Sequence, residues 1–133
     1  MINRLALLLL VAVLAGCGST TPGTTTTTVP TTTARALRPI EIESPAWNAT
    51  VSSPFHVSGT ASVYEATLVI ELRRPSGVLT RRTISASEGA PGRGTFDATF
   101  TASPGKLVVA VYSPSAVNGE PQHEVDVPVT VTP

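Results

Sequence analysis

The chain has 133 residues, a formal net charge of zero at pH 7, and only 14% charged residues. A surface that binds nucleic acid needs a concentrated positive charge, so this composition argues against nucleic acid as a partner. Cys17 is the only cysteine. The chain therefore closes no internal disulfide, and a folded domain must be stabilised by its hydrophobic core alone.

The first segment has the features of an export signal. Arg4 is its only charged residue, and residues 5–14 form an unbroken apolar run. A transmembrane helix needs roughly 20 apolar residues, so this run is too short to span a bilayer. Residues 1–16 are therefore predicted to be a signal peptide, which takes no part in the fold.

The apolar run ends in Leu14-Ala15-Gly16-Cys17, which resembles the bacterial lipobox. In that motif, small residues precede the cleavage site and the cysteine thiol carries a diacylglyceryl group. The resemblance implies that Cys17 is lipidated with palmitate-like acyl chains, which are sufficient for stable anchoring when two are present. The expected location is the extracytoplasmic face of the cell membrane. The alternative is an ordinary signal peptide that ends in a cysteine by chance.

A low-complexity segment follows the lipobox. Residues 17–38 are rich in threonine and proline, with an unbroken threonine run at 24–28. Such a segment buries too little apolar surface to offset the entropy lost on ordering. We predict that residues 17–38 are the lipidated cysteine and a disordered stalk, with a reach of about 60 Å if it is extended. The stalk is either a bare spacer or a site of glycosylation.

From Pro39 onward, short alternating runs are separated by turn residues, a pattern typical of β-sandwiches. No window has a convincing helical period, and 12 prolines and 10 glycines leave little room for helices. Residues 39–133 are therefore predicted to form one immunoglobulin-like antiparallel β-sandwich of about seven strands, without a disulfide. The expected strands are 40–43, 55–58, 66–73, 79–86, 95–101, 106–112 and 125–131.

Three positions in this pattern carry specific expectations. Residues 106–112 are apolar at both parities, which favours a central, buried strand. Pro128 interrupts the alternation of valines near the end of the chain, and because it has no N–H it predicts a free edge or a bulge there. Trp47 is expected to cover one end of the core.

Several motifs of the predicted domain point to one family. They are Ser-Pro-Ala-Trp-Asn-Ala-Thr-Val-Ser-Ser-Pro at 44–54, Val-Ser-Gly-Thr-Ala at 57–61, Val-Tyr-Glu-Ala at 63–66, Leu72, Gly-Ala-Pro-Gly-Arg-Gly-Thr-Phe at 89–96 and Glu-Val-Asp-Val-Pro-Val-Thr-Val at 124–131. Over residues 39–131 the series resembles the immunoglobulin-like domain of bacterial spore germination, which often occurs beside a GerMN-type domain. Arg93 stands where that family commonly has an aromatic residue. The resemblance implies an immunoglobulin-like fold and a cell-envelope setting, and it supplies no catalytic residues.

The sequence offers few candidates for chemistry. His56 is expected to face solvent and His123 to precede the last strand, and without a third ligand nearby they do not predict a metal site. No catalytic motif is present, so we expect no enzymatic activity and no cofactor. Glu65 is either a structural carboxylate that accepts hydrogen bonds from a loop backbone or a ligand-binding carboxylate.

Four arginines flank a predicted turn at residues 74–77 and are expected to converge at one end of a hairpin. They are either a solvated, aggregation-resistant hairpin end or a candidate anion-binding patch for a wall polymer, lipid head groups or an acidic protein. Trp47 and Tyr112 are the aromatic residues that would support sugar stacking. The four arginines are Arg73, Arg74, Arg81 and Arg82.

Together these features predict a non-enzymatic cell-envelope lipoprotein whose immunoglobulin-like domain is a binding or accessory module. The expected partners are the membrane, through the lipid anchor, and an envelope protein or an anionic cell-wall polymer. The alternative is a carbohydrate- or wall-polymer-binding module, which would require a planar row of exposed aromatic residues.

Overall fold

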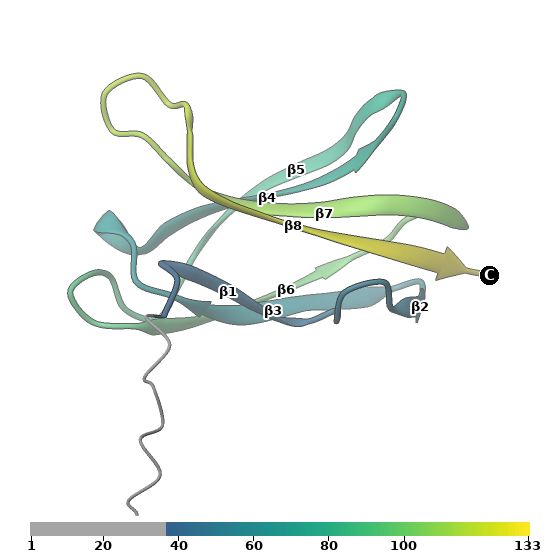
Figure 1. Cartoon of the computed structure of the whole chain (residues 1–133), viewed down its shortest axis with the longest axis horizontal. Helices are drawn as coiled ribbons and strands as arrows, with labels where there is room; N and C mark the ends of the chain where they lie inside the picture. The colour runs from purple at the N-terminus through teal and green to yellow at the C-terminus, as the bar shows by residue number, and fades with distance from the viewer. Residues whose placement is uncertain (1–36) are drawn as a thin grey trace, which may run out of the picture. The chain divides into compact units, whose positions relative to one another are not determined.

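The computed structural model describes residues 37–133, so the predicted signal peptide (1–16), Cys17 and nearly all of the predicted stalk (17–38) lie outside the described residues. Residues 37–133 form eight β-strands, one 3₁₀-helical turn and no α-helix (Figure 1). In chain order the elements are β1 (Ile40–Ser44), β2 (Thr50–Ser52), β3 (Phe55–Ala61), η1 (Tyr64–Ala66), β4 (Thr67–Arg74), β5 (Gly77–Ser85), β6 (Gly94–Phe100), β7 (Gly105–Pro114) and β8 (Pro121–Thr132).

The strands form two sheets that pack face to face, as Figure 1 shows. One sheet has three strands in the order β1-β3-β6, and the other has five in the order β2-β8-β7-β4-β5. All strand pairs are antiparallel except β2–β8, which is parallel. The predicted immunoglobulin-like β-sandwich is confirmed, with eight strands where about seven were expected.

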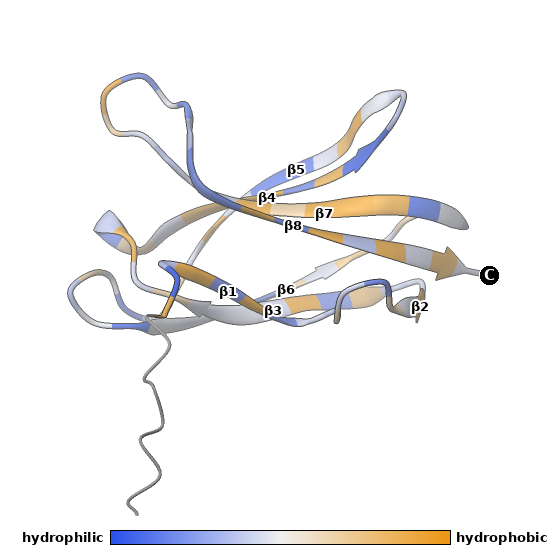
Figure 2. Ribbon diagram, in the orientation of Figure 1, coloured by the Kyte–Doolittle hydropathy of each residue, from blue (hydrophilic) through white to orange (hydrophobic). Residues whose placement is uncertain are grey.

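The core forms where the inward-facing residues of the two sheets meet. β7 lies between β8 and β4, and Val109 and Val111 on it are fully buried. Figure 2 shows β7 as a nearly continuous apolar strand and β8 as an alternating one. This difference follows from their positions, because the outer face of β7 is also covered. The prediction that residues 106–112 are the central strand is confirmed.

The short strand β2 was not expected, and it explains the position of Pro128. Asn48 donates its backbone N–H to the carbonyl of Pro128 at 2.9 Å, and Thr130 donates to the carbonyl of Ala49 at 2.9 Å. The backbone groups of Pro128 therefore point toward the β2 side of β8 and away from β7. The missing N–H faces the segment just before β2, so the β7–β8 ladder is intact. The predicted free edge or bulge at Pro128 is wrong, because β8 lies between β2 and β7 and its register with β7 shifts only near Val111.

The expectation that Trp47 covers the core is wrong. Trp47 is 67% exposed, because it lies in a tight turn closed by a hydrogen bond of 3.0 Å from Ala49 N–H to the Ala46 carbonyl. That end of the core is filled by Phe55 and Phe100, whose ring centroids are 6.4 Å apart. They are the first residue of β3 and the last of β6, and they lie opposite each other in the register.

Candidate functional site

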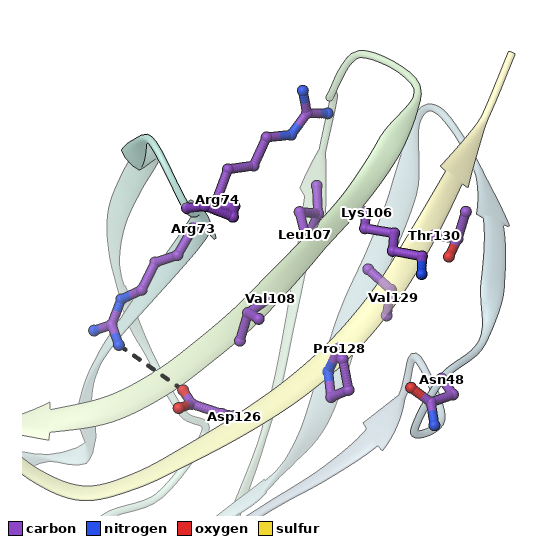
Figure 3. Close-up of a pocket in the computed structure, with 11 residues that line it drawn as sticks. Asn48, Arg73, Arg74, Lys106, Leu107, Val108, Asp126, Pro128, Val129 and Thr130 are labelled. Atoms are coloured by element: carbon purple, nitrogen blue, oxygen red, sulfur yellow. Dashed lines mark ion pairs between the residues drawn. The ribbon is translucent and has the colours of Figure 1, made fainter.

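The four arginines do not form the single cluster that was expected, because the hairpin divides them between the two faces of the five-stranded sheet. Arg81 lies opposite Glu71 and Arg82 lies opposite Ile70 in the β4–β5 register. Successive side chains of a strand point to opposite faces. Ile70 faces the core, so Arg82 is on the inner side and Arg81 is on the outer side. Arg73 and Arg74 are likewise consecutive, and Figure 3 shows their side chains pointing in different directions.

Two of the arginines hold the ends of the sandwich together. The Nη2 of Arg74 donates to the carbonyls of Ser103 and Pro104 at 2.6 and 3.2 Å, which ties the hairpin to the β6–β7 loop. Arg82 donates to the Thr99 carbonyl at 3.1 Å, and its guanidinium carbon lies 5.0 Å from the centroid of the Phe100 ring. These contacts engage one nitrogen of each guanidinium, and Arg74 Nε is buried without a hydrogen-bond partner in residues 37–133.

The other two arginines meet a buried carboxylate, Glu71, which is 2% exposed. Arg73 Nε donates to one oxygen of Glu71 at 2.6 Å, and Arg81 Nε donates to the other at 2.5 Å. The Tyr112 hydroxyl also donates to Glu71, at 2.9 Å. Charge-assisted hydrogen bonds of this kind are stronger than neutral ones. The Glu71 carboxylate is therefore fully engaged and does not face a ligand.

Tyr112 is only 5% exposed, so the expectation that it supports sugar stacking is wrong. Its position follows from the register: it lies opposite Val69 on the outer face, one diagonal step from Glu71. The ring also lies under Arg73, whose guanidinium carbon is 6.0 Å from the ring centroid. Both groups cover the outer face of β4 and β7.

The network continues to β8 through two further carboxylates. Arg73 Nη1 contacts Glu124 at 2.7 Å and Asp126 at 3.9 Å. Arg73 therefore joins β4 to β8 across the central strand β7. We call Glu71, Arg73, Arg81, Tyr112, Glu124 and Asp126 the outer-face network.

The pKa values in the network follow from burial and from these contacts. Burial on its own would raise the pKa of Glu71, but hydrogen bonds from Arg73, Tyr112 and Arg81 outweigh it, and the pKa lies below its usual value. Burial raises the pKa of Tyr112, and its hydrogen bond to Glu71 raises it further. Burial and then repulsion from Glu124 raise the pKa of Asp126. Glu71 is thus held as an anion at neutral pH.

A groove of about 490 Å³ lies beside this network, between the β4–β5 hairpin and the turn at Asn48 (Figure 3). Val108 and Pro128 lie between its two sides. We call it the outer-face groove. Its charged lining residues are Arg73, Arg74, Lys106 and Asp126.

Lys106 is the most available cation of the groove. It is exposed and forms no ion pair within the described part of the chain, whereas Arg73 and Arg74 are engaged in the contacts above. Sequence reasoning missed it because a single lysine shows no pattern. The groove therefore combines apolar surface with the positive charges of Lys106 and Arg74, neither of which has an ion-pair partner within residues 37–133.

The two histidines lie apart. His56 is exposed on β3, as predicted, and its Nδ1 is 3.1 Å from an oxygen of Asp97. His123 lies within β8, not before it, and it lines a cleft with Ser62 and Val63, beyond the far end of β3 from His56. Residues 37–133 contain no group of three His, Cys, Asp or Glu side chains that could hold a metal ion. Over the same range there is no helix of the length and apolarity that crossing a bilayer requires.

Comparison with known families gives one match. Residues 39–120 match the family described as the immunoglobulin-like domain of bacterial spore germination. The match ends directly before β8, so it is shorter than the span of 39–131 that the sequence motifs suggested. No curated protein matches the chain significantly.

Proposed function

Because the chain belongs to the family of immunoglobulin-like domains of bacterial spore germination, we propose that it is a non-enzymatic binding or accessory module of the cell envelope, lipid-anchored through Cys17. The outer-face groove is the observation that supports a binding role. The outer-face network holds Arg73 and Asp126 on one side of the groove, and a preformed site loses little entropy when a partner binds. We assign the contact with an envelope partner to this groove.

The cross-linking chemistry of the chain offers a direct test. Lys106 is the only lysine in the sequence, so an amine-reactive cross-linker joins this chain to a partner through the groove or through its terminal amine. We expect treatment of intact cells to give an adduct with an envelope component, and we expect Lys106→Arg to abolish it. Mass spectrometry identifies the adduct. The same adduct from the Lys106→Arg chain would contradict an assignment to the groove.

A second candidate function is the binding of an anionic wall polymer in the same groove, and the free ammonium of Lys106 favours it. A single exposed charge contributes about 0–1 kcal/mol. Lys106→Gln should therefore weaken binding to purified cell wall by up to about fivefold at low salt, and the difference should shrink as salt rises. The measurement is a pull-down across a salt series.

Arg82→Gln is the matched control, since it removes the same charge from the inner side of the sheet. Arg73 and Arg81 are unsuitable for this test because they hold Glu71. Equal losses from Lys106→Gln and Arg82→Gln would mean that the wall responds to total charge and not to the groove.

A further inference from the structure

A second cleft lies at the end of the sandwich where the described chain begins. It has a volume of about 550 Å³ and lies between η1 and the β7–β8 loop, which Figure 1 shows at the same end. We call it the end cleft. Its lining includes Pro39, Tyr64, Glu65, Val117 and His123. The outer-face groove shares none of these residues.

The end cleft displays the two most exposed large apolar side chains of residues 37–133. Val117 is 94% exposed and Tyr64 is 72% exposed. Both line the same cleft, one from the β7–β8 loop and one from η1. Single exposed apolar residues are ordinary, but two on facing sides of one cleft form a surface suited to an apolar partner group.

Both segments are closed by backbone hydrogen bonds, so each exposed side chain is presented from a defined turn. The β7–β8 loop is closed by hydrogen bonds of 2.8 Å from Ser115 N–H to the Glu120 carbonyl and from Gly119 N–H to the Ser115 carbonyl. On the other side, Ala90 N–H donates to the Val63 carbonyl at 2.9 Å and braces η1 from the β5–β6 loop. A partner would therefore meet a preformed site.

Backbone strain is concentrated at the same place. Residues 37–133 contain four non-glycine residues with positive φ, and three of them are Glu65, Ala66 and His123, with φ of 55°, 55° and 56°. Non-glycine residues in this region are uncommon, and strained residues cluster at functional sites. The strain at Glu65 and Ala66 gives the turn that presents Tyr64.

The charge of the end cleft is negative. Counting histidine as neutral, Glu65 is the only lining residue that carries a charge at pH 7. Its carboxylate makes no ion pair or side-chain hydrogen bond within the described residues. The expectation that Glu65 accepts hydrogen bonds from a loop backbone is therefore not met, and the alternative of a ligand-facing carboxylate is left. Tyr64 beside it adds an exposed ring face, which also attracts cations.

We propose that the end cleft docks an extended segment of a partner protein that carries a lysine or arginine next to an apolar side chain. The apolar group would lie between Tyr64 and Val117, and the cation would pair with Glu65. This inference adds a second site to the proposed module and does not depend on the outer-face groove. The negative charge disfavours the other candidate occupant, an anionic lipid surface.

Site-specific photo-cross-linking of the full-length chain in cells tests the proposal. The photoreactive residue p-benzoylphenylalanine is placed at position 64 in one variant and at position 117 in another. We expect both variants to capture the same partner segment, with a lysine or arginine adjacent to the cross-linked region. In each background Glu65→Lys should lower the yield by about tenfold or more, because like charges across an interface repel. Glu65→Gln, which keeps the side-chain shape, should lower it by a smaller factor.

Glu43→Lys is the matched control: it makes the same charge change on β1, outside the end cleft, and should leave the yield unchanged. The proposal is overturned if the adducts contain lipid alone, if the two positions capture different proteins, or if neither position gives an adduct. It is also overturned if Glu65→Lys leaves the cross-linking yield unchanged. If these adducts are absent while the Lys106-dependent adduct is present, the docking role of the end cleft is rejected and the proposed function is retained.

Discussion

Replacing Glu71 with alanine is expected to lower the free energy of unfolding by about 3 kcal/mol. Removing one partner of a buried ion pair costs about 3–5 kcal/mol, because the remaining charges stay desolvated. Here the loss falls at the lower end, since the Arg81 side chain is 64% exposed and regains water. Arg73 keeps its contact with Glu124, but the Tyr112 hydroxyl loses its acceptor. Urea unfolding of residues 37–133 measures the change.

Glu124→Ala is the control for this prediction. Glu124 pairs with the same arginine, but its side chain is 31% exposed, so its removal should cost about 1 kcal/mol or less. The pH dependence gives a second check. The pKa of Glu71 is lowered in the folded state, so its contribution is present above the ordinary pKa of 4.5 and is lost as the pH falls through the folded value. The gap between wild type and Glu71→Ala should therefore narrow in acid. Equal losses from the two variants would contradict a special role for Glu71.

The strands could be predicted from the sequence because their alternation is set by burial. Leu68, Ile70 and Leu72 face the core, so apolar residues recur at every second position of β4. This alternation is visible in the sequence whatever the pairing of β4 with its neighbours. The same holds for the valines of β8. What alternation leaves undetermined is which residues of two neighbouring strands lie opposite each other.

The outer-face network depends on that missing information. The β4–β5 register shifts at a bulge after Leu72: Arg73 lies opposite Val78, but Leu72 lies opposite Thr80. Without the extra residue, Thr80 would lie opposite Glu71, and Arg81 would lie opposite the core-facing Ile70. The bulge therefore places Arg81 beside Glu71 and sends Arg82 to the inner side. The four arginines look like one cluster in the sequence because no local signal marks the bulge.

The end cleft could not be predicted for a similar reason. Its two sides are the η1 turn and the β7–β8 loop, which are separated in sequence by four strands. The positive φ values at Glu65 and Ala66 occur in residues that rarely adopt them, so composition gives no warning of the turn. The motif Val63-Tyr64-Glu65-Ala66 is recognisable in the sequence, but only the fold shows that it lies beside the β7–β8 loop.

Cys17→Ala should abolish metabolic labelling of the chain by a fatty acid analogue, whereas Ser19→Ala, a comparable change two residues away, should keep the label. Cys17 is the only cysteine, so no other thiol is available for the diacylglyceryl group. Labelling is a better measurement than membrane fractionation, because an uncleaved signal segment would hold the variant at the membrane without any lipid. A label that persists in Cys17→Ala, or that never appears in the wild type, would contradict the lipoprotein assignment. The domain would then reach the envelope without an anchor, and both of its proposed contact surfaces would have to act from solution, where two acyl chains no longer concentrate it at the membrane.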